Sequence, residues 1–524
     1  MTEEKALQVR PNTDRLWRPS LIVFISNACI MTIELVAGRL IAPFVGVSIY
    51  TWTSVIGVIL AGISIGNYIG GKLADRFASR RLLGAAFILA GLASVSVLAT
   101  VGAIGERGLP ALAWMPLVGR MLLFVTAIFL LPSILLGVIS PIVVKLSLQD
   151  LDSSGSTVGR IYAASALGSI VGTFATGYVL ISLFGTRAIL LGIGAVLIAM
   201  GLLFGRWLRG AAKPALASAV PLIAASALAA GPLQATLRGP CLRETDYFCI
   251  RVRDETRDDG ETYRVLTLDR LVHSYVSLGD PRRLVYGYEQ VGAEVLGYME
   301  REYDRIDAFF IGGGGYTLPR YLEVAHPRSI IEVAEIDPGV TEVAHQMLGL
   351  PRSTKIKTTN QDARLFLLGL NPARRYNLIV GDAFNDFSVP YHLTTHEFNQ
   401  LVRRHLTDDG IYMLNLIDGG ELPFVSAMLR TLSLTFDWIY FVPVGRRWTD
   451  VTRNTFIVLA SPQPINVERL RSFDGGDGVR NINQWIVTPE ERERIMAMGD
   501  GTILTDDYVP TDNLLAPMFE TAAR

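Results

Sequence analysis

The chain of 524 residues lacks several features that would point to a particular class of protein. It has no long run of Lys or Arg and no basic stripe with interleaved aromatic residues, and its formal net charge is −1. A nucleic-acid partner is therefore not expected. From residue 240 onward, no G-x-S-x-G motif is present to support a hydrolase. The six histidines show no spacing typical of a zinc site, so we predict no metal.

Apolar sequence is abundant instead, since 50% of the residues are hydrophobic. They concentrate in residues 20–233, where seven segments have the roughly 20 apolar residues that cross a bilayer as a helix. The predicted spans are 20–44, 50–71, 82–104, 121–146, 161–184, 188–205 and 214–233. We therefore predict a cytoplasmic segment (1–19), a transmembrane domain (20–233), a β-rich region (240–305) and a Rossmann-like domain (306–524).

Basic residues in the short loops predict the orientation, because Lys and Arg are retained on the cytoplasmic side of a membrane. Loops on the side of the N-terminus contain thirteen Lys and Arg residues, and the opposite loops contain three or four. We expect an integral inner or plasma membrane protein with a cytoplasmic N-terminus. Seven spans place the soluble domain outside the cytoplasm, and a missed or re-entrant span would reverse this.

Cys241 and Cys249 flank the start of the soluble domain. A disulfide between them would suit an oxidising compartment, and the alternative is two unpaired small hydrophobic residues in a strand. Together with the loop charges, the disulfide is the favoured interpretation.

Two features of the membrane part have modest interpretations. The segment GGKLADRFASRR (70–81) resembles a cytoplasmic loop of major-facilitator transporters, and its alternative is a tight basic turn between helices. Gly168 and Gly172, in GSIVG, are expected to let helices pack closely.

The soluble part opens with two apolar, β-branched runs, 247–252 and 263–269, which predict a β-hairpin. Four further strand-like runs, at 306–312, 329–336, 355–360 and 376–382, alternate with helical segments. This alternation predicts a parallel sheet of βαβ units. A ligand of such a sheet lies at the carboxyl ends of the strands.

FFIGGGG (309–315) runs from a strand into glycines, which allow the backbone to approach a ligand closely. Glu335 ends the next strand, 21 residues beyond Gly314, where an acid accepts both hydroxyls of a ribose. Together they predict an adenosine site. Asp362 and Asp382 end the third and fourth strands, so four loops are expected to converge on one edge.

These motifs resemble the polyamine aminopropyltransferases typified by spermidine synthase, and more closely the membrane-fused spermidine-synthase-like proteins. The resemblance spans about residues 245–460 and depends on TLDRLVHSYV, EIDP, NQDARLFL, YNLIVGDAFND and LTTHEF. It implies decarboxylated S-adenosylmethionine, or S-adenosylmethionine, as a co-substrate, with no tightly bound cofactor. It implies that the co-substrate contacts Gly312, Gly313, Gly314, Glu335, Asp337, Asp362 and Ala363.

The resemblance also makes Asp382 the catalytic acid, which would orient an amine and help to remove its proton. That amine has an ordinary pKa of about 10.4, like that of lysine. A diamine needs a further carboxylate for its distal ammonium, for which Asp386, Glu289 and Asp269 are available. Residues expected to contact the amine substrate are Tyr286, Tyr288, Glu289, His273, Asn385 and Asp386. The two tyrosines are alternatives for one hydroxyl, or ordinary core aromatics.

The sequence departs from the family pattern at the amine end. The loop GGGDG reads GGGGY, which leaves Gly315 in place of an aspartate. The paired acids D-x-x-D become Asp382 and Asn385, with Asp386 shifted by one place. His273 replaces a glutamine and Arg270 a glycine.

We predict a membrane-anchored aminopropyltransferase that acts on a polyamine or another amine. One alternative is an S-adenosylmethionine-dependent methyltransferase on the same fold, which would not need the missing acids. The other is a non-catalytic polyamine or nucleoside sensor, or a transporter-associated domain, which an extracytoplasmic location favours because adenosyl sulfonium donors are made in the cytosol. Expected partners are a small-molecule amine and the lipid bilayer, and a homo-oligomer is possible.

Overall fold

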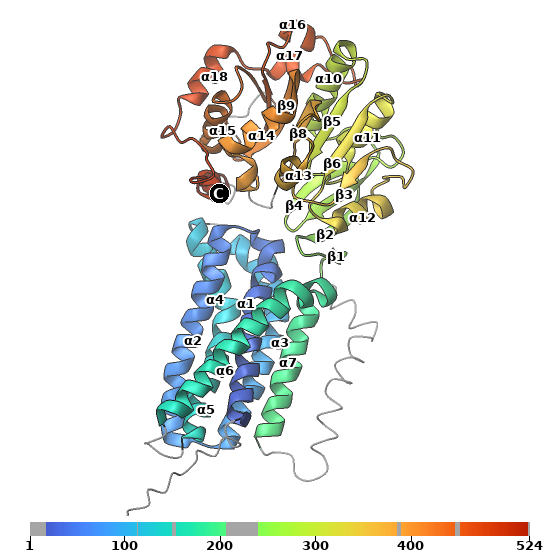
Figure 1. Cartoon of the computed structure of the whole chain (residues 1–524). Coiled ribbons are helices and arrows are strands. Elements are labelled where there is room, and N and C mark those ends of the chain that lie inside the picture. The colour runs from blue at the N-terminus through green and yellow to red at the C-terminus, as the bar shows by residue number, and fades with distance from the viewer. Residues whose placement is uncertain are drawn as a thin grey trace, which may run out of the picture. The chain divides into compact units, whose positions relative to one another are not determined.

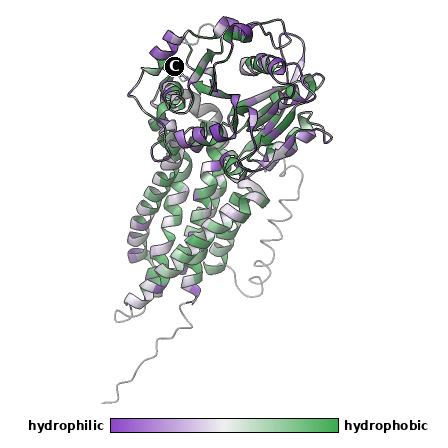
Figure 2. Ribbon diagram, turned by 45° about the horizontal axis from the view of Figure 1, so that its top comes forward, coloured by the Kyte–Doolittle hydropathy of each residue, from purple (hydrophilic) through white to green (hydrophobic). Residues whose placement is uncertain are grey.

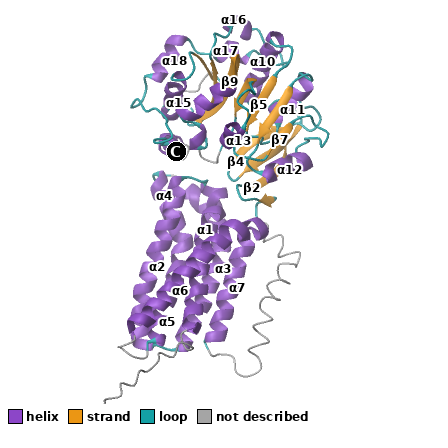
Figure 3. Cartoon of the chain, in the orientation of Figure 1, coloured by secondary structure: helices purple, strands orange, loops and turns teal. Residues whose placement is uncertain are grey.

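A computed structural model describes residues 17–112, 114–148, 154–205, 239–384, 389–445 and 451–521. The chain divides into two compact units (Figures 1 and 3). One consists mainly of the N-terminal helices, and the other mainly of Pro240–Arg524.

The N-terminal unit is entirely helical within its described residues, and its helices are predominantly hydrophobic (Figure 2). Its elements are α1 (Trp17–Val45), α2 (Ile49–Phe77), α3 (Arg80–Ala111), α4 (Leu117–Gly137), α5 (Ile139–Ser147), α6 (Ser154–Ala175), the π-helical turn η2 (Thr176–Leu180) and α7 (Ile181–Phe204). Among the described residues, five helical segments are long and apolar enough to cross a membrane.

The predicted number of seven spans is not confirmed. The fifth segment, Ser154–Phe204, has 51 residues, which is more than twice the roughly 20 that one crossing needs. Its backbone leaves the helical region at Gly185 (φ 72°, ψ 162°). The predicted spans 161–184 and 188–205 are therefore its two arms on either side of that break. The predicted span 214–233 lies outside the described residues.

Glycines bring α1 and α6 into backbone contact. A Cβ atom on Gly168 would lie 2.1 Å from the carbonyl oxygen of Phe24, and one on Gly172 would lie 2.5 Å from that of Ala28. No side chain fits at either position, so the expectation that these glycines allow close helix packing is confirmed.

Replacing Gly168 with leucine is therefore expected to separate α1 from α6 and to lower the free energy of unfolding by about 1–3 kcal/mol or more. Gly159→Leu is the matched control on the same helix, because a Cβ atom there meets nothing within 4 Å. Thermal unfolding of the two purified variants in one detergent measures the difference. Equal unfolding midpoints would contradict the packing described above.

The unit that consists mainly of Pro240–Arg524 is here called the soluble unit. It opens with a four-stranded antiparallel sheet in the order β1-β2-β3-β4. Its strands are β1 (Arg243–Glu244), β2 (Cys249–Thr256), β3 (Thr262–Leu268) and β4 (Leu271–Val276). The predicted hairpin corresponds to β2 and β3, which pair antiparallel, but the sheet has two more strands. A disulfide joins Cys241 to Cys249, so these two cysteines are bridged.

The larger sheet has seven strands in the order β10-β11-β9-β8-β5-β6-β7. They are β5 (Asp307–Ile311), β6 (Ile330–Ala334), β7 (Lys357–Thr359), β8 (Tyr376–Gly381), β9 (Leu406–Asp418), β10 (Trp438–Pro443) and β11 (Asn454–Ser461). Strands β5 to β9 pair in parallel, and β11 is antiparallel to both of its neighbours. The four predicted parallel strands are confirmed, and the fold is Rossmann-like.

Helices cover both faces of this sheet. Helices α10 (Gly287–Glu302), α11 (Thr317–Ala325) and α12 (Pro338–Met347) share one buried core with the inward side chains of Ala308 and Phe310. Phe309, between them, points to the other face and stacks on Phe366 of α13 (Ala363–Gly369) at 5.0 Å. Successive side chains of a strand alternate between faces, so each central strand is buried on both sides.

Further helices complete the unit: α14 (His396–His405) and α15 (Pro423–Ser433) contact β9. The remaining elements are the 3₁₀ turn η3 (Tyr391–Leu393), α16 (Val467–Leu470), α17 (Asn481–Trp485), α18 (Pro489–Met496) and α19 (Thr511–Thr521).

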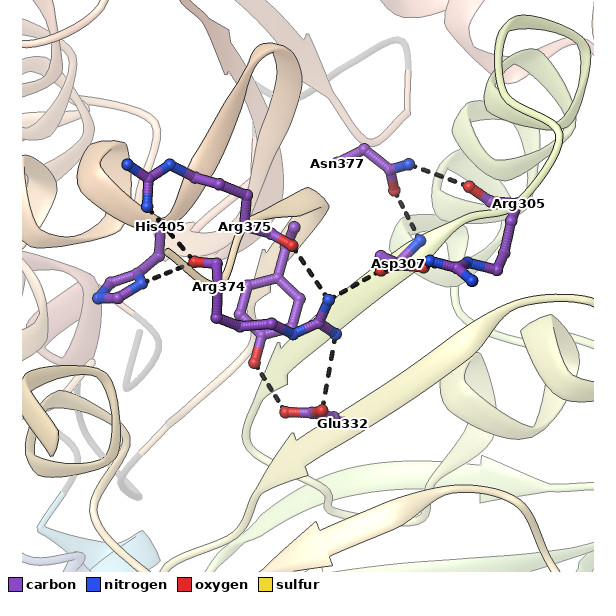
Figure 4. Close-up of polar contacts among 8 residues, drawn as sticks. Arg305, Asp307, Glu332, Arg374, Arg375, Asn377 and His405 are labelled. Carbon is purple, nitrogen blue, oxygen red and sulfur yellow. Dashed lines mark hydrogen bonds and ion pairs between the residues drawn. The ribbon is translucent and has the colours of Figure 1, made fainter. Parts of the chain in front are cut away.

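An ion-pair network joins β5, β6 and β8 near their amino ends (Figure 4). Arg374 lies 2.8 Å from Asp307 and 3.6 Å from Glu332, and it stacks over the ring of Tyr376. The hydroxyl of Tyr376 donates to Glu332 at 2.7 Å. These charges pair with one another at the end opposite the glycine loop, which leaves the carboxyl ends for a ligand.

Candidate functional site

The carboxyl ends of four parallel strands surround one cavity of about 290 Å³, here called the larger cavity. Gly312 follows β5, Glu335 follows β6, Asp362 follows β7 and Asp382 follows β8, and all four line it. The structure therefore brings together the residues that the sequence placed in four separate loops.

The glycine loop passes so close to the backbone that follows β8 that a side chain does not fit between them. Gly312 has φ 94°, and a Cβ atom there would lie 2.8 Å from the carbonyl oxygen of Asp382. Oε2 of Glu335 accepts the N–H groups of Gly313 at 2.7 Å and Gly314 at 3.2 Å, so this carboxylate fixes the loop.

Glu335 is 5% exposed, and burial raises its pKa, opposed by the N–H donors that surround the carboxylate. Each carboxylate oxygen has a second lone pair. The same group can therefore hold the loop and accept the hydroxyls of a bound ribose.

Asp337, expected to contact a co-substrate, does not line the cavity. Its Oδ1 accepts the N–H of Gly339 at 2.7 Å and so caps α12, and its Oδ2 accepts the hydroxyl of Thr245 at 2.5 Å. Asp337 is fully buried and links the two sheets. Its carboxylate therefore stabilises the fold through these hydrogen bonds.

Asp362 and Ala363 line the far wall of the larger cavity. Oδ2 of Asp362 lies 2.7 Å from Nε2 of His392, and Oδ1 accepts the N–H of Leu365 at 3.0 Å. Burial raises the pKa of Asp362, but these hydrogen bonds outweigh burial and the pKa is lowered. Asp362 is therefore ionised at neutral pH.

Aromatic side chains, which the sequence did not single out, complete this wall. They are Tyr247, Phe248 and Tyr391, beside His392. Flat apolar rings next to hydrogen-bonding groups suit a purine base, which presents an apolar face and a polar edge.

A second cavity of about 90 Å³, here called the smaller cavity, adjoins the first. The two share Gly312, Gly314, His273, Asp382 and Phe384. A molecule in the larger cavity therefore meets one in the smaller cavity at Asp382.

Two polar side chains hold Asp382 at this junction. Nδ2 of Asn415 donates to Oδ1 at 2.8 Å, and the hydroxyl of Tyr288 donates to Oδ2 at 3.1 Å. Burial raises the pKa of Asp382 to about 6, with both hydrogen bonds opposing it. A carboxylate with a pKa close to neutral is suited to accept a proton.

Asn415 was missed by the sequence reading, although an amide inside the apolar run IYMLNLI (411–417) of β9 was a usable signal. Its Oδ1 is buried and has no hydrogen-bond partner among the described residues. Buried polar atoms normally have partners, so this oxygen is available to a ligand N–H.

Tyr288, rather than Tyr286, is the tyrosine paired with Asp382. The hydroxyl of Tyr286 donates instead to the carbonyl oxygen of Val272 at 3.0 Å. Both rings line the smaller cavity, so neither is only a core aromatic.

The acids expected to hold a distal ammonium do not line either cavity among the described residues. Glu289 is fully buried, accepts the hydroxyl of Thr317 and the N–H of Tyr286, and has a pKa raised by burial to about 7. Asp269 accepts the N–H of Cys249 at 2.9 Å. The other expected amine contacts, Asn385 and Asp386, lie outside the described residues.

Gly315 stands where the family has an aspartate, and its surroundings exclude any side chain. A Cβ atom there would lie 2.5 Å from Cβ of Ser274 and 2.9 Å from Cγ2 of Val276. The N–H of Gly315 donates to Oγ of Ser274 at 2.9 Å. Residues of β4 therefore occupy the space that an aspartate would need.

His273 and Arg453 line the smaller cavity beside Asp382. Burial, with a smaller contribution from the charge of Arg453, lowers the pKa of His273 to about 4, so the imidazole is neutral at pH 7. Its Nε2 is buried without a hydrogen-bond partner among the described residues. The sequence reading named His273 but gave no signal for Arg453, which lies outside the recognised motifs.

No family model matches the chain. A segment of 114 residues is 32% identical to a polyamine aminopropyltransferase of Vibrio vulnificus and covers 21% of this chain and 38% of that protein. Another of 139 residues is 30% identical to an eEF1A lysine and N-terminal methyltransferase of Bos taurus, and covers 25% of this chain and 20% of that protein. The chain thus spans well under half the length of these relatives.

Among solved structures, a probable spermidine synthase of Corynebacterium glutamicum is 19% identical, with a TM-score of 0.43, over 50% of this chain and 95% of that one. The relatives by sequence include both aminopropyltransferases and methyltransferases.

Gly315→Asp is expected to lower the free energy of unfolding by more than about 2 kcal/mol, because a buried side chain must displace Ser274 and Val276. Gly279→Asp is the control, since a Cβ atom there meets nothing within 4 Å. Adding Ser274→Gly should recover part of the loss. Thermal unfolding of the full-length variants measures this, and a Gly315→Asp variant as stable as Gly279→Asp would contradict the packing.

Proposed function

We propose that the soluble unit transfers an alkyl group from an S-adenosyl sulfonium donor to an amine nitrogen. The observation that carries the proposal is the position of Asp382, a partly buried carboxylate with a pKa of about 6 at the junction of two cavities. In this proposal the larger cavity binds the donor nucleoside and the smaller one binds the reacting ends.

We infer an adenosyl donor because the residues around the larger cavity suit a nucleoside. Glu335 would accept the ribose hydroxyls, and the glycine loop would lie against the sugar and the sulfonium. Asp362, Ala363 and the aromatic wall would hold the base. These assignments follow the resemblance residue by residue, except that Asp337 is engaged in capping α12.

The chemistry needs an unprotonated amine. Its lone pair attacks the carbon attached to the sulfonium, the C–S bond breaks, and its electron pair stays on sulfur as a neutral thioether. The nitrogen must lose one proton, which Asp382 accepts, while Oδ1 of Asn415 accepts a second N–H and directs the lone pair at the carbon. Tyr288 keeps the carboxylate in place.

The transferred group separates two versions of this reaction. The resemblance favours an aminopropyl group from decarboxylated S-adenosylmethionine. The packing of Gly315 favours the second candidate, methyl transfer from S-adenosylmethionine, because the acid that would hold a donor ammonium has no room.

Purified full-length protein should turn over one of these two donors with a panel of amines. Asp382→Asn should lower kcat/KM by about 10²–10⁴-fold, the range of a lost general base. Because only the ionised carboxylate accepts a proton, wild-type kcat/KM should rise as pH increases through about 6, and the variant should lack this step.

Asp408→Asn, which changes a side chain that is 91% exposed, is the control and should leave kcat/KM unchanged. Turnover with only the decarboxylated donor selects aminopropyl transfer, and turnover with only the ordinary donor selects methyl transfer. Tight nucleoside binding without turnover would contradict the proposed transfer reaction and would support a non-catalytic nucleoside sensor instead. If no nucleoside binds, both the transfer reaction and the sensor are rejected.

We further propose that the helices anchor this unit in a membrane with residues 240–524 outside the cytoplasm. The charge asymmetry of the loops and the Cys241–Cys249 disulfide support this orientation, because disulfides persist in oxidising compartments. Five helical segments among the described residues are long and apolar enough to cross a membrane, and this orientation requires an odd number of crossings before residue 240.

Alkaline phosphatase fused after residue 524 should be active, and the same reporter inserted at residue 79, between α2 and α3, should be inactive. Green fluorescent protein at the two sites should give the opposite pattern. Thiol labelling of intact cells should reach Cys241 and Cys249 only after reduction. Phosphatase activity at residue 79 alone would reverse the orientation.

A further inference from the structure

The aromatic wall of the larger cavity belongs to a short hairpin. Tyr247 and Phe248, which line the cavity, lie in the turn between β1 and β2. Strand β2 pairs with β3 over seven residues, whereas β1 has two residues and lies at the edge of the four-stranded sheet. So short a strand has few backbone hydrogen bonds, and a hairpin of this kind is only marginally stable without further contacts.

The disulfide ties the β1 arm of this hairpin to a fixed point in the sheet. Cys249 begins β2 directly after Phe248 and is 4% exposed. Its N–H donates to Oδ1 of Asp269 at 2.9 Å, and its carbonyl oxygen accepts the N–H of Asp269 at 3.0 Å. The S–S bond attaches Cys241, which precedes β1 and is partly exposed, to this anchored residue.

Thr245 fixes the turn itself. Its hydroxyl oxygen accepts the N–H groups of Phe248 at 2.9 Å and Tyr247 at 3.2 Å, and its O–H donates to Oδ2 of Asp337 at 2.5 Å. A Cβ atom on Gly339, in the first turn of α12, would lie 2.3 Å from Cγ2 of Thr245. The two aromatic rings therefore keep their place at the cavity while the β1 arm holds Thr245 in contact with the loop after β6.

We propose that the Cys241–Cys249 disulfide controls nucleoside binding, so that the larger cavity binds an adenosyl ligand tightly only when the two cysteines are oxidised. Reduction adds two electrons and two protons to the S–S bond, which gives two thiols and converts a dithiol reductant to its own disulfide. It frees the arm that holds Thr245, and the aromatic wall loses its fixed position. This inference rests on the proposed function, since the ligand is the nucleoside of the donor assigned there.

This control couples the site to the compartment. Disulfides form in oxidising compartments and are rare in the cytosol. In the orientation proposed above, the nucleoside site is completed only after the soluble unit has left the cytosol. A newly made chain with free thiols therefore binds cytosolic adenosyl compounds weakly.

Calorimetry with 5′-methylthioadenosine on the full-length Cys29→Ser protein tests the proposal, because Cys29 is the third cysteine and is not bridged. If the hairpin is ordered in about one reduced molecule in ten, the apparent Kd rises about tenfold when dithiothreitol reduces the disulfide. The variant that also carries Cys241→Ser and Cys249→Ser should bind like the reduced protein. Its Kd should not respond to dithiothreitol.

The turn is tested separately with the disulfide intact. Thr245→Val should raise the Kd for methylthioadenosine about fivefold, the effect of one lost hydrogen bond. Thr256→Val is the matched control, because Thr256 is an exposed threonine at the other end of β2. It should leave the Kd unchanged.

The reduction potential gives a measurement that a purely structural bridge would not change. If the disulfide raises nucleoside affinity tenfold, bound nucleoside favours the disulfide by the same factor. Saturating methylthioadenosine should therefore lower the potential of the pair by about 30 mV, the equivalent of a tenfold change for a two-electron couple. Alkylation of free thiols in dithiothreitol redox buffers measures the potential, and this result decides alone if the serine variant does not fold.

The inference is overturned if reduced and oxidised proteins bind methylthioadenosine equally, or if the ligand leaves the potential unchanged. It is also overturned if reduction unfolds the soluble unit as a whole, because the disulfide is then a general structural link. Thermal unfolding of the reduced protein decides that point. Failure of the oxidised wild type to bind either methylthioadenosine or S-adenosylhomocysteine would instead reject the proposed function.

Discussion

The partly buried carboxylate of Asp382 is the constraint that organises the soluble unit. An ionised carboxylate is costly inside a protein, and it persists only where donors surround it. Asn415 from β9 and Tyr288 from α10 supply those donors. Three segments far apart in the sequence must therefore meet at one point, and the parallel order of β5, β8 and β9 brings them there. The same burial raises the pKa to a range useful for proton transfer.

The sequence was informative where function depends on local pattern. Parallel strands buried on both faces are apolar runs, and the residues that end them share one edge, so Glu335, Asp362 and Asp382 were predictable together. The direction of a side chain within a loop is not a local property. Asp337 follows the same strand as Glu335, yet it caps α12 and contacts Thr245 because the smaller sheet packs beside it. The position of Arg453 at the cavity depends on an antiparallel strand late in the chain, and no sequence motif marks that strand.

The membrane part shows the same division. Hydropathy located the helical segments, because about 20 apolar residues are needed for each crossing whatever the neighbours are. The number of crossings depends on single breaks, and Gly185 interrupts a segment that is apolar on both sides. The close packing of Gly168 against Phe24 was readable because small residues four apart are a local signal.

At the amine end of the site, several residues together differ from the motif pattern of the aminopropyltransferases. An aspartate at position 315 would meet Ser274 and Val276, so its absence is built into β4 and would not be reversed by one substitution. Arg453 adds a positive charge to the same cavity, while Asp382 keeps its place and its donors. Asp382 lies at the junction of the two cavities although desolvation of its carboxylate opposes folding, and the hydrogen bonds from Asn415 and Tyr288 offset part of that cost.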